Sequence, residues 1–204
     1  MRRLVALLLA AACARSPAAA PEPSPEPVWF LPSAGCTDSV GRALPSERAT
    51  DTLSAAFSRQ RPDAANAYAA RRLPGGYASG SYPTAGGRGI MWLRDTTLRD
   101  SILARLPAMP GLSFVALPPD SVEVRQVAWD GAALYDWMWY IVRNIPTGAT
   151  KGVNGYGIDR RNRVLLSVVS RADVGPLLER LDRLGVPCQL VVFEVIGEIS
   201  IISG

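Results

Sequence analysis

This chain of 204 residues contains no histidine, which limits the chemistry that it can carry out. Ser-His-Asp and Cys-His catalysis, His-ligated zinc and a histidine general base are therefore excluded from it. Carboxylates are left for acid–base catalysis or for binding a hard cation, and the candidates are Asp95, Asp100, Asp130 and Asp159. Asp95 and Asp130 occupy helix-cap positions and Asp159 a turn position, and the set lacks the dense alternation of a calcium-binding loop. We predict no catalytic, cofactor-binding or metal-binding residue, with a small carboxylate-dependent hydrolase as the alternative.

Two other motifs invite a chemical interpretation but are better explained by structure. Gly152-x-x-Gly155-x-Gly157 has the glycine content of a phosphate-binding loop. Such loops require a helix N-terminus directly after the glycines, whereas a strand-like run follows here, so we expect close strand packing. Lys151 is the only lysine and hence the only base for a Ser–Lys dyad, and its polar surroundings predict an exposed loop residue.

Aromatic side chains are concentrated in one predicted helix, where they could serve the core or a partner. Successive helical residues turn by about 100°, so Trp137, Trp139 and Tyr140 cannot all face the same side. Those outside the apolar stripe form either a second packing layer or an exposed contact surface, and the sequence leaves both interpretations open. The apolar strand near the C-terminus and the tail 198–204 are further candidates for contact. The residues predicted for a partner surface are Trp139, Tyr140, Leu190, Val192, Ile199 and Ile201.

These residues are positioned by two copies of one predicted unit, which follow an N-terminal helical segment at 46–72 that Pro62 interrupts. In each copy, two strand-like runs joined by a tight turn precede a helix with one apolar face and a hydrophobic strand. The first copy is predicted to have strands at 77–82, 89–93 and 122–129, with a helix around 98–106. The second is predicted to have strands at 152–159, 163–169 and 190–196, with a helix over 172–184.

The predicted fold class follows from the sequence similarity between the two copies. Residues 80–88 align with 155–163 at an offset of 75, and residues 121–130 align with 189–198 at an offset of 68. A further helix, opened by Asp130, lies between the copies. The predicted class is α+β, with duplicated ββαβ units joined by a helix and preceded by an N-terminal helical segment. The predicted domain spans 36–204, with repeat one at about 77–130 and repeat two at about 152–198.

The first residues have the pattern of an export signal. Two arginines precede a short apolar run at 4–12, which is too short to span a bilayer as a helix. Small residues before Cys13 resemble a bacterial lipobox, in which Cys13 would carry the lipid, and ordinary signal cleavage is the alternative. The predicted leader covers 1–20, and a proline-rich linker suited to a membrane tether covers 21–35. We expect a membrane-anchored lipoprotein of the cell envelope, or a secreted protein if lipidation does not occur.

The two remaining cysteines, Cys36 and Cys188, form an even pair in a compartment expected to be oxidising. A disulfide between them would close a loop of about 150 residues, for which the chain-entropy relation allows roughly 4 to 5 kcal/mol. Two separate buried thiols are the alternative.

The second copy also carries a family resemblance. Gly155-Tyr-Gly-Ile-Asp-Arg-Arg-Asn-Arg-Val-Leu-Leu-Ser-Val168, followed by a helix and a strand, resembles the C-terminal part of the prodomains of α-lytic-type secreted bacterial serine proteases. Those prodomains have an aromatic strand, a hairpin turn of Asp, Arg and Asn, and a Val-rich strand in this order. The resemblance implies a protein that assists the folding of a protease and inhibits it, partly by pairing a strand across the interface. No protease domain follows in this sequence, so such a role would act in trans.

Composition and charge favour a globular binding protein. The chain is 48% hydrophobic and 20% charged, as in ordinary folded domains, and its formal charge of +4 is too small for a dedicated nucleic-acid binder. We predict a non-enzymatic, exported, lipid-anchored protein that acts through protein–protein contact, without cofactor or nucleic acid. The alternative partner is a secreted serine protease, which the chain would fold or inhibit in trans. An exposed sheet edge at 190–196 would favour that partner, whereas a covered edge would favour a plain structural lipoprotein.

Overall fold

The computed structural model describes residues 28–29, 41–45, 62–73, 75–81, 88–112, 118–145, 152–187 and 189–196, and these form an α+β fold. The helices of this part of the chain are α2 (Pro62–Ala70), α3 (Arg99–Arg105), α4 (Gly131–Asn144) and α5 (Val174–Arg183). The strands are β1 (Val28–Trp29), β2 (Tyr77–Ser81), β3 (Gly89–Leu93), β4 (Val122–Gln126), β5 (Val153–Ile158), β6 (Val164–Val168) and β7 (Val191–Val195). The α+β class predicted from the sequence is confirmed.

The two halves of the chain share one connectivity. In the first half β2 pairs with β3 antiparallel and β3 pairs with β4 parallel, and in the second half β5, β6 and β7 repeat this pattern. The second sheet has one more strand, in the order β1-β7-β6-β5. Each half also begins with a helix, α2 before β2 and α4 before β5. The helix expected to join two ββαβ units is therefore the first element of an αββαβ unit.

The alignment offsets predicted from the sequence are wrong by one residue for two of the three strands. β3 and β6 correspond at the predicted offset of 75, because Gly89 faces Val122 just as Val164 faces Val191. The same register places β4 and β7 at an offset of 69 rather than 68. Similarly, Tyr77 and Val153 both begin their ladders and are both buried, which gives an offset of 76. A shift of one residue exchanges the two faces of a strand, so this correction decides which side chains are buried.

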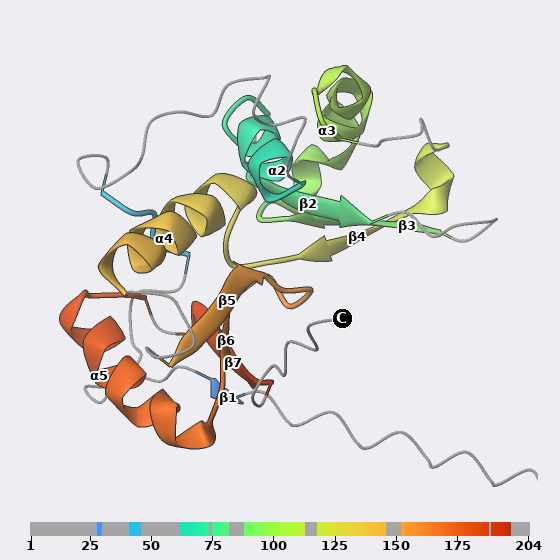
Figure 1. Ribbon diagram of the computed structural model, residues 1–204. Helices are drawn as coiled ribbons and strands as arrows, with labels where there is room; N and C mark the ends of the chain where they lie inside the picture. Colours follow the sequence, from blue (N-terminus) through green and yellow to red (C-terminus); the bar gives the residue numbers. More distant parts are fainter. Residues whose placement is uncertain are drawn as a thin grey trace, which may run out of the picture.

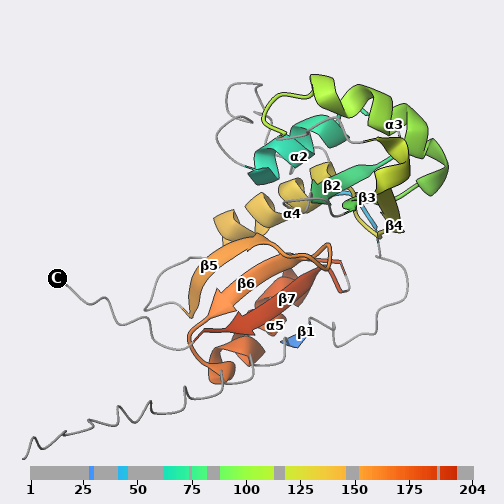
Figure 2. The same ribbon diagram turned by 90° about the vertical axis from the view of Figure 1, so that its right-hand side faces the viewer.

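The helices pack on one face of each sheet. Figure 1 shows α4 and α5 on the same side of β5, β6 and β7, where their buried side chains form one core with those of β6 and β7. A second core joins α3, the end of α2 and the inner face of β3. In Figure 2, α4 lies between α2 and the β5–β7 sheet. Ala64 and Ala67 of α2 belong to the first core and Ala69 to the second, so α2 connects the two units.

The start of α4 fixes how the units meet. The carboxylate of Asp130 accepts a hydrogen bond from the Ala133 N–H and caps the helix, as the sequence predicts. A Cβ at Gly131 would lie 2.6 Å from the carbonyl oxygen of Ala78 in β2 and 3.0 Å from that of Asn66 in α2. Only glycine permits this approach, which brings the first turn of α4 against both elements of the other unit.

Several sequence predictions lie outside the described residues. They concern the export signal and linker, the helical stretch before Pro62, the tail 197–204, and the residues Cys13, Cys36, Cys188, Lys151, Ile199 and Ile201. Among the residues described, none of the helices is long and apolar enough to cross a membrane.

Candidate functional site: the cleft between the two units

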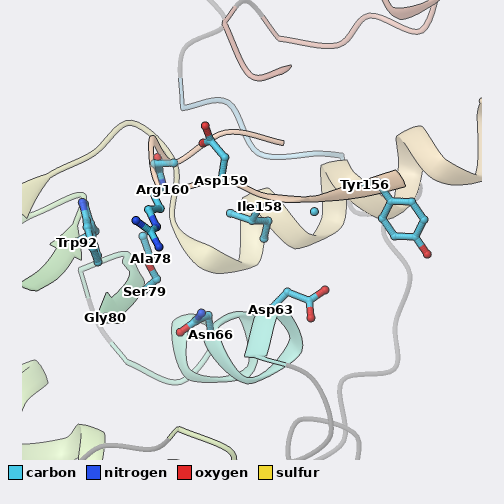
Figure 3. Close-up of a pocket in the computed structure, with 12 residues that line it drawn as sticks. Asp63, Asn66, Ala78, Ser79, Gly80, Trp92, Tyr156, Ile158, Asp159 and Arg160 are labelled. Atoms are coloured by element: carbon cyan, nitrogen blue, oxygen red, sulfur yellow. The ribbon is translucent and has the colours of Figure 1, made fainter. Parts of the chain in front are cut away.

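A cleft of about 400 Å³ lies between the two units. Figure 3 shows its labelled lining residues: α2 and β2 form one wall, and β5 with the turn after it forms the other. The lining residues are Asp63, Asn66, Ala78, Ser79, Gly80, Trp92, Tyr156, Gly157, Ile158, Asp159, Arg160 and Asn162. We call this the inter-unit cleft.

Two edge strands line the inter-unit cleft, one from each unit. β2 is at the edge of the β2-β3-β4 sheet, and β5 is at the edge of the β1-β7-β6-β5 sheet. The two strands occupy equivalent positions in the repeated fold. At Gly157 of β5 a Cβ would meet no atom within 4 Å, so the face of the strand is open at this residue. An edge strand carries backbone N–H and C=O groups that its own sheet does not pair.

The turn between β5 and β6 is held by its own backbone and by Asp159. The Asp159 N–H donates to the Arg163 carbonyl and the Asn162 N–H to the Asp159 carbonyl, while the Asp159 carboxylate accepts from the N–H groups of Arg161 and Arg163. Asn162 adopts a left-handed conformation with φ of 62°. Asparagine tolerates this region better than most residues, and the arrangement is that of a hairpin with a bulge.

Asn162 also attaches the hairpin to the segment that joins the two units, between β4 and α4. Its amide nitrogen donates to the Trp129 carbonyl at 2.8 Å, and its amide oxygen accepts from the Trp129 N–H at 3.0 Å. Trp129 is fully buried just before α4, and the Arg163 guanidinium lies 4.6 Å from the centre of its ring. We call the paired Asn162 and Trp129 the amide clamp. It fixes the hairpin beside the inter-unit cleft, a role that the interpretation of Asn162 as a simple turn residue does not predict.

The carboxylates predicted as alternatives for chemistry have structural partners. Asp95 accepts from Thr97, Asp130 caps α4, and the exposed Asp100 pairs with Arg99. Asp159 lines the cleft, and burial raises the pKa of its carboxyl although nearby N–H groups and arginines oppose the shift. These contacts agree with the predicted cap and turn positions.

Asp63 is the other carboxylate that lines the cleft, but the two acids do not converge on a shared point. In Figure 3 the carboxylates of Asp63 and Asp159 point away from each other, and that of Asp159 is turned toward its own hairpin. Within the described residues, no group of three or more Cys, Asp or Glu side chains is placed to hold a metal ion.

Arg160 and Trp92 are two cleft residues whose side chains make no hydrogen bond, ion pair or ring contact with the described residues. Arg160 is exposed and makes no hydrogen bond or ion pair within the described part of the chain. Trp92 is half-buried on the face of β3 opposite Met91 and Leu93, and it belongs to neither hydrophobic core. In Figure 3 the Arg160 side chain extends from the hairpin turn toward Trp92 and Ser79. Neither is predicted as a site residue from the sequence, although the strict alternation of β3 places Trp92 on its outer face.

The predicted partner surface needs correction at two residues. Leu190 and Val192 are fully buried, because both faces of β7 are covered in the fold. Trp139 and Tyr140 are half-buried and pack against the first core. Trp139 makes edge contacts with Tyr135 and Tyr156, so much of its ring serves internal packing.

The strand edge expected at 190–196 is covered at residues 192 and 193. β1 pairs antiparallel with β7, so that Val28 faces Phe193 and Trp29 faces Val192. The unpaired edge of this sheet is instead β5, on its other side. Strand addition at β7, the arrangement that would favour a protease partner, therefore meets β1 at the centre of the strand.

Comparison with protein-family models, with curated proteins and with solved structures finds no match to this chain. The inter-unit cleft is therefore interpreted from its own residues and geometry.

Proposed function

We propose that this chain is a non-enzymatic binding protein that acts through contact with another polypeptide, and that it is exported and lipid-anchored through Cys13. An extended segment of the partner would lie in the inter-unit cleft. One observation carries the proposal: the edge strands of both sheets line the same cleft, β2 through residues 78–80 and β5 through residues 156–158.

The physical basis is strand addition. A partner segment in extended conformation can pair its backbone with an unpaired strand edge, which supplies affinity, while alternate side chains enter adjoining pockets and supply specificity. Gly157 leaves room for a partner side chain on the face of β5 beside that edge, because the space that a Cβ would occupy there has no neighbouring atom within 4 Å. The opposite wall offers polar groups of Ser79 and Asn66 and the ring of Trp92.

Site-specific photo-crosslinking tests the proposal. p-Benzoylphenylalanine would replace Tyr156, which lines the cleft, in the full chain expressed with its own leader in bacteria. The matched control replaces Tyr68, an aromatic residue of α2 that is not part of the lining. We expect a polypeptide to be cross-linked from position 156 and not from position 68. Equal cross-linking from both positions, or none from position 156, would contradict the proposal.

A pair of glycine variants shows whether the cleft itself is used. Gly157→Val places its Cβ in open space, and valine favours a strand, so the variant should fold. Gly155→Val is the matched control, since its Cβ would only contact Ser167 at 3.7 Å and Gly155 does not line the cleft. Cross-linking from position 156 should be lost with Gly157→Val and kept with Gly155→Val.

A second candidate is the in-trans folding assistant or inhibitor of a secreted serine protease. It is supported by the element order of the second unit, in which β5, the bulged hairpin, the Val-rich β6, α5 and β7 follow one another as in the prodomains that this segment resembles. The test is refolding of an α-lytic-type protease domain with and without the full chain. A higher yield, or inhibition of the folded enzyme, would favour this candidate, and neither effect would remove it.

A further inference from the structure

We propose that the segment bound in the inter-unit cleft carries an acidic side chain, Asp or Glu, which pairs with Arg160 while a neighbouring apolar residue packs on Trp92. This inference rests on the proposed function, because it names the chemistry of the polypeptide that the cleft receives. It is carried by two cleft residues, one from each unit, that the fold itself leaves unused.

Arg160 is presented by a rigid turn whose other members are engaged. Asp159 accepts from two backbone N–H groups, Asn162 holds Trp129, and Arg163 lies over the Trp129 ring. Arg161 lies 3.7 Å from the Asp159 carboxylate. Only the Arg160 guanidinium, among the five residues 159–163 of the described hairpin, extends into the cleft without a bond to the protein. A fixed backbone lowers the entropy lost when such a side chain binds a ligand.

Trp92 supplies the apolar half of the site. Its neighbours in β3, Met91 and Leu93, are fully buried in the second core, while Trp92 is half-buried on the opposite face. Tryptophan and arginine are among the residue types most enriched at the positions that dominate binding energy at interfaces. Their convergence from two separate units marks the cleft as a recognition site rather than a packing defect.

The positive charge of Arg160 indicates which polar group the bound segment carries. A guanidinium binds a carboxylate through two parallel hydrogen bonds, which are charge-assisted and stronger than neutral ones. The adjacent acid in the chain, Asp159, is turned toward its own hairpin. The Arg160 guanidinium is therefore available to a carboxylate of the partner. Two edge strands along the cleft favour a chain that passes through it, so we assign the carboxylate to a side chain and not to a peptide C-terminus.

The test uses a positional-scanning library of octapeptides, each acetylated at the N-terminus and amidated at the C-terminus, against the full chain. We expect mixtures with a central Asp or Glu to bind at least about tenfold more tightly than those with Asn or Gln, as a charge-assisted pair implies. Arg160→Gln should abolish this preference. The matched control is Arg171→Gln, which removes the same charge from an exposed arginine that does not line the cleft. Arg171→Gln should leave the preference unchanged.

The outcomes separate this inference from the proposed function. Peptide binding that is lost with Gly157→Val but shows no preference for acids, or a preference that survives Arg160→Gln, would overturn the inference and leave the proposed function intact. A requirement for an unblocked C-terminus, measured with free-acid versions of the same mixtures, would overturn it as well. Absence of any binding, or binding unaffected by Gly157→Val, would refute the proposed function and the inference together.

Discussion

Replacing Asn162 with glycine should weaken the attachment of the β5–β6 hairpin to the segment before α4, and two hydrogen bonds set the size of the loss. The Asn162 amide satisfies both the N–H and the carbonyl of Trp129 at 3.0 and 2.8 Å, and Trp129 is fully buried. A buried backbone group that loses its partner costs about 1–3 kcal/mol. Water entering the space left by the amide restores part of this, so we expect Asn162→Gly to lower the free energy of unfolding by about 2–4 kcal/mol.

A second substitution at Asn162 separates the hydrogen bonds from the backbone conformation. Glycine adopts the observed φ of 62° freely, whereas alanine is strained there by about 1–2 kcal/mol. Asn162→Ala should therefore be less stable than Asn162→Gly by roughly that amount, although glycine is usually the more destabilising residue. If both variants lost the same amount, the left-handed conformation would not contribute as argued.

Urea denaturation followed by tryptophan fluorescence and by far-ultraviolet circular dichroism measures both effects. The dependence of the unfolding free energy on urea should be unchanged between variants, so that the midpoint alone reports stability. A stability of Asn162→Gly within about 0.5 kcal/mol of the wild type would refute the reasoning, because surface substitutions without a specific role fall in that range. In that case the amide clamp would be incidental to the fold.

Two further predictions concern α4. Gly131→Ala should destabilise the protein by about 1–3 kcal/mol in the same assay, because its Cβ would press on the Ala78 carbonyl, whereas Gly175→Ala in α5 meets nothing within 4 Å and should be neutral or stabilising. Burial raises the pKa of the Asp136 carboxyl despite its ion pair with Arg71 at 2.6 Å, so the folded state favours the protonated form. The wild type should therefore gain stability relative to Asp136→Asn as pH falls from about 6 to about 3, and the opposite trend would show that Arg71 dominates.

The local elements of this fold were predictable because their signals are local. The bounds of β3 agree with the alternation at 89–93, and the cap of α4 agrees with Asp130. The hairpin after β5 follows from Asp159 and Asn162, which suit turn conformations. The register of β7 was not predictable, because its first three residues, Val191 to Phe193, are all apolar and buried and give no alternation to fix which side faces the core.

The candidate site was only partly predictable because it depends on how two units pack. The sequence predicts a duplicated unit, yet nothing in either copy indicates that β2 and β5 face one cleft. That arrangement depends on Gly131, because the absence of a side chain there allows α4 to approach β2 closely. The covering of β7 by β1 is equally non-local, since β1 lies at 28–29 and β7 at 191–195. Arg160 and Trp92 acquire their shared position only through these contacts.

The other edges of the two sheets differ from the edges that line the inter-unit cleft. Exposed edges invite unwanted pairing, and proteins usually protect them with another strand, with charge or by keeping them short. β7 is covered by β1, and β1 itself has two residues. β4 carries the exposed pair Glu123 and Arg125, with 46% and 52% of their side chains accessible. Among the described strands, β2 and β5 are paired on one side only, carry no charged residue and lie on the same cleft. Two strands with the same place in their sheets thus leave an edge open on one cleft, which is the arrangement that the proposed binding of an extended polypeptide requires.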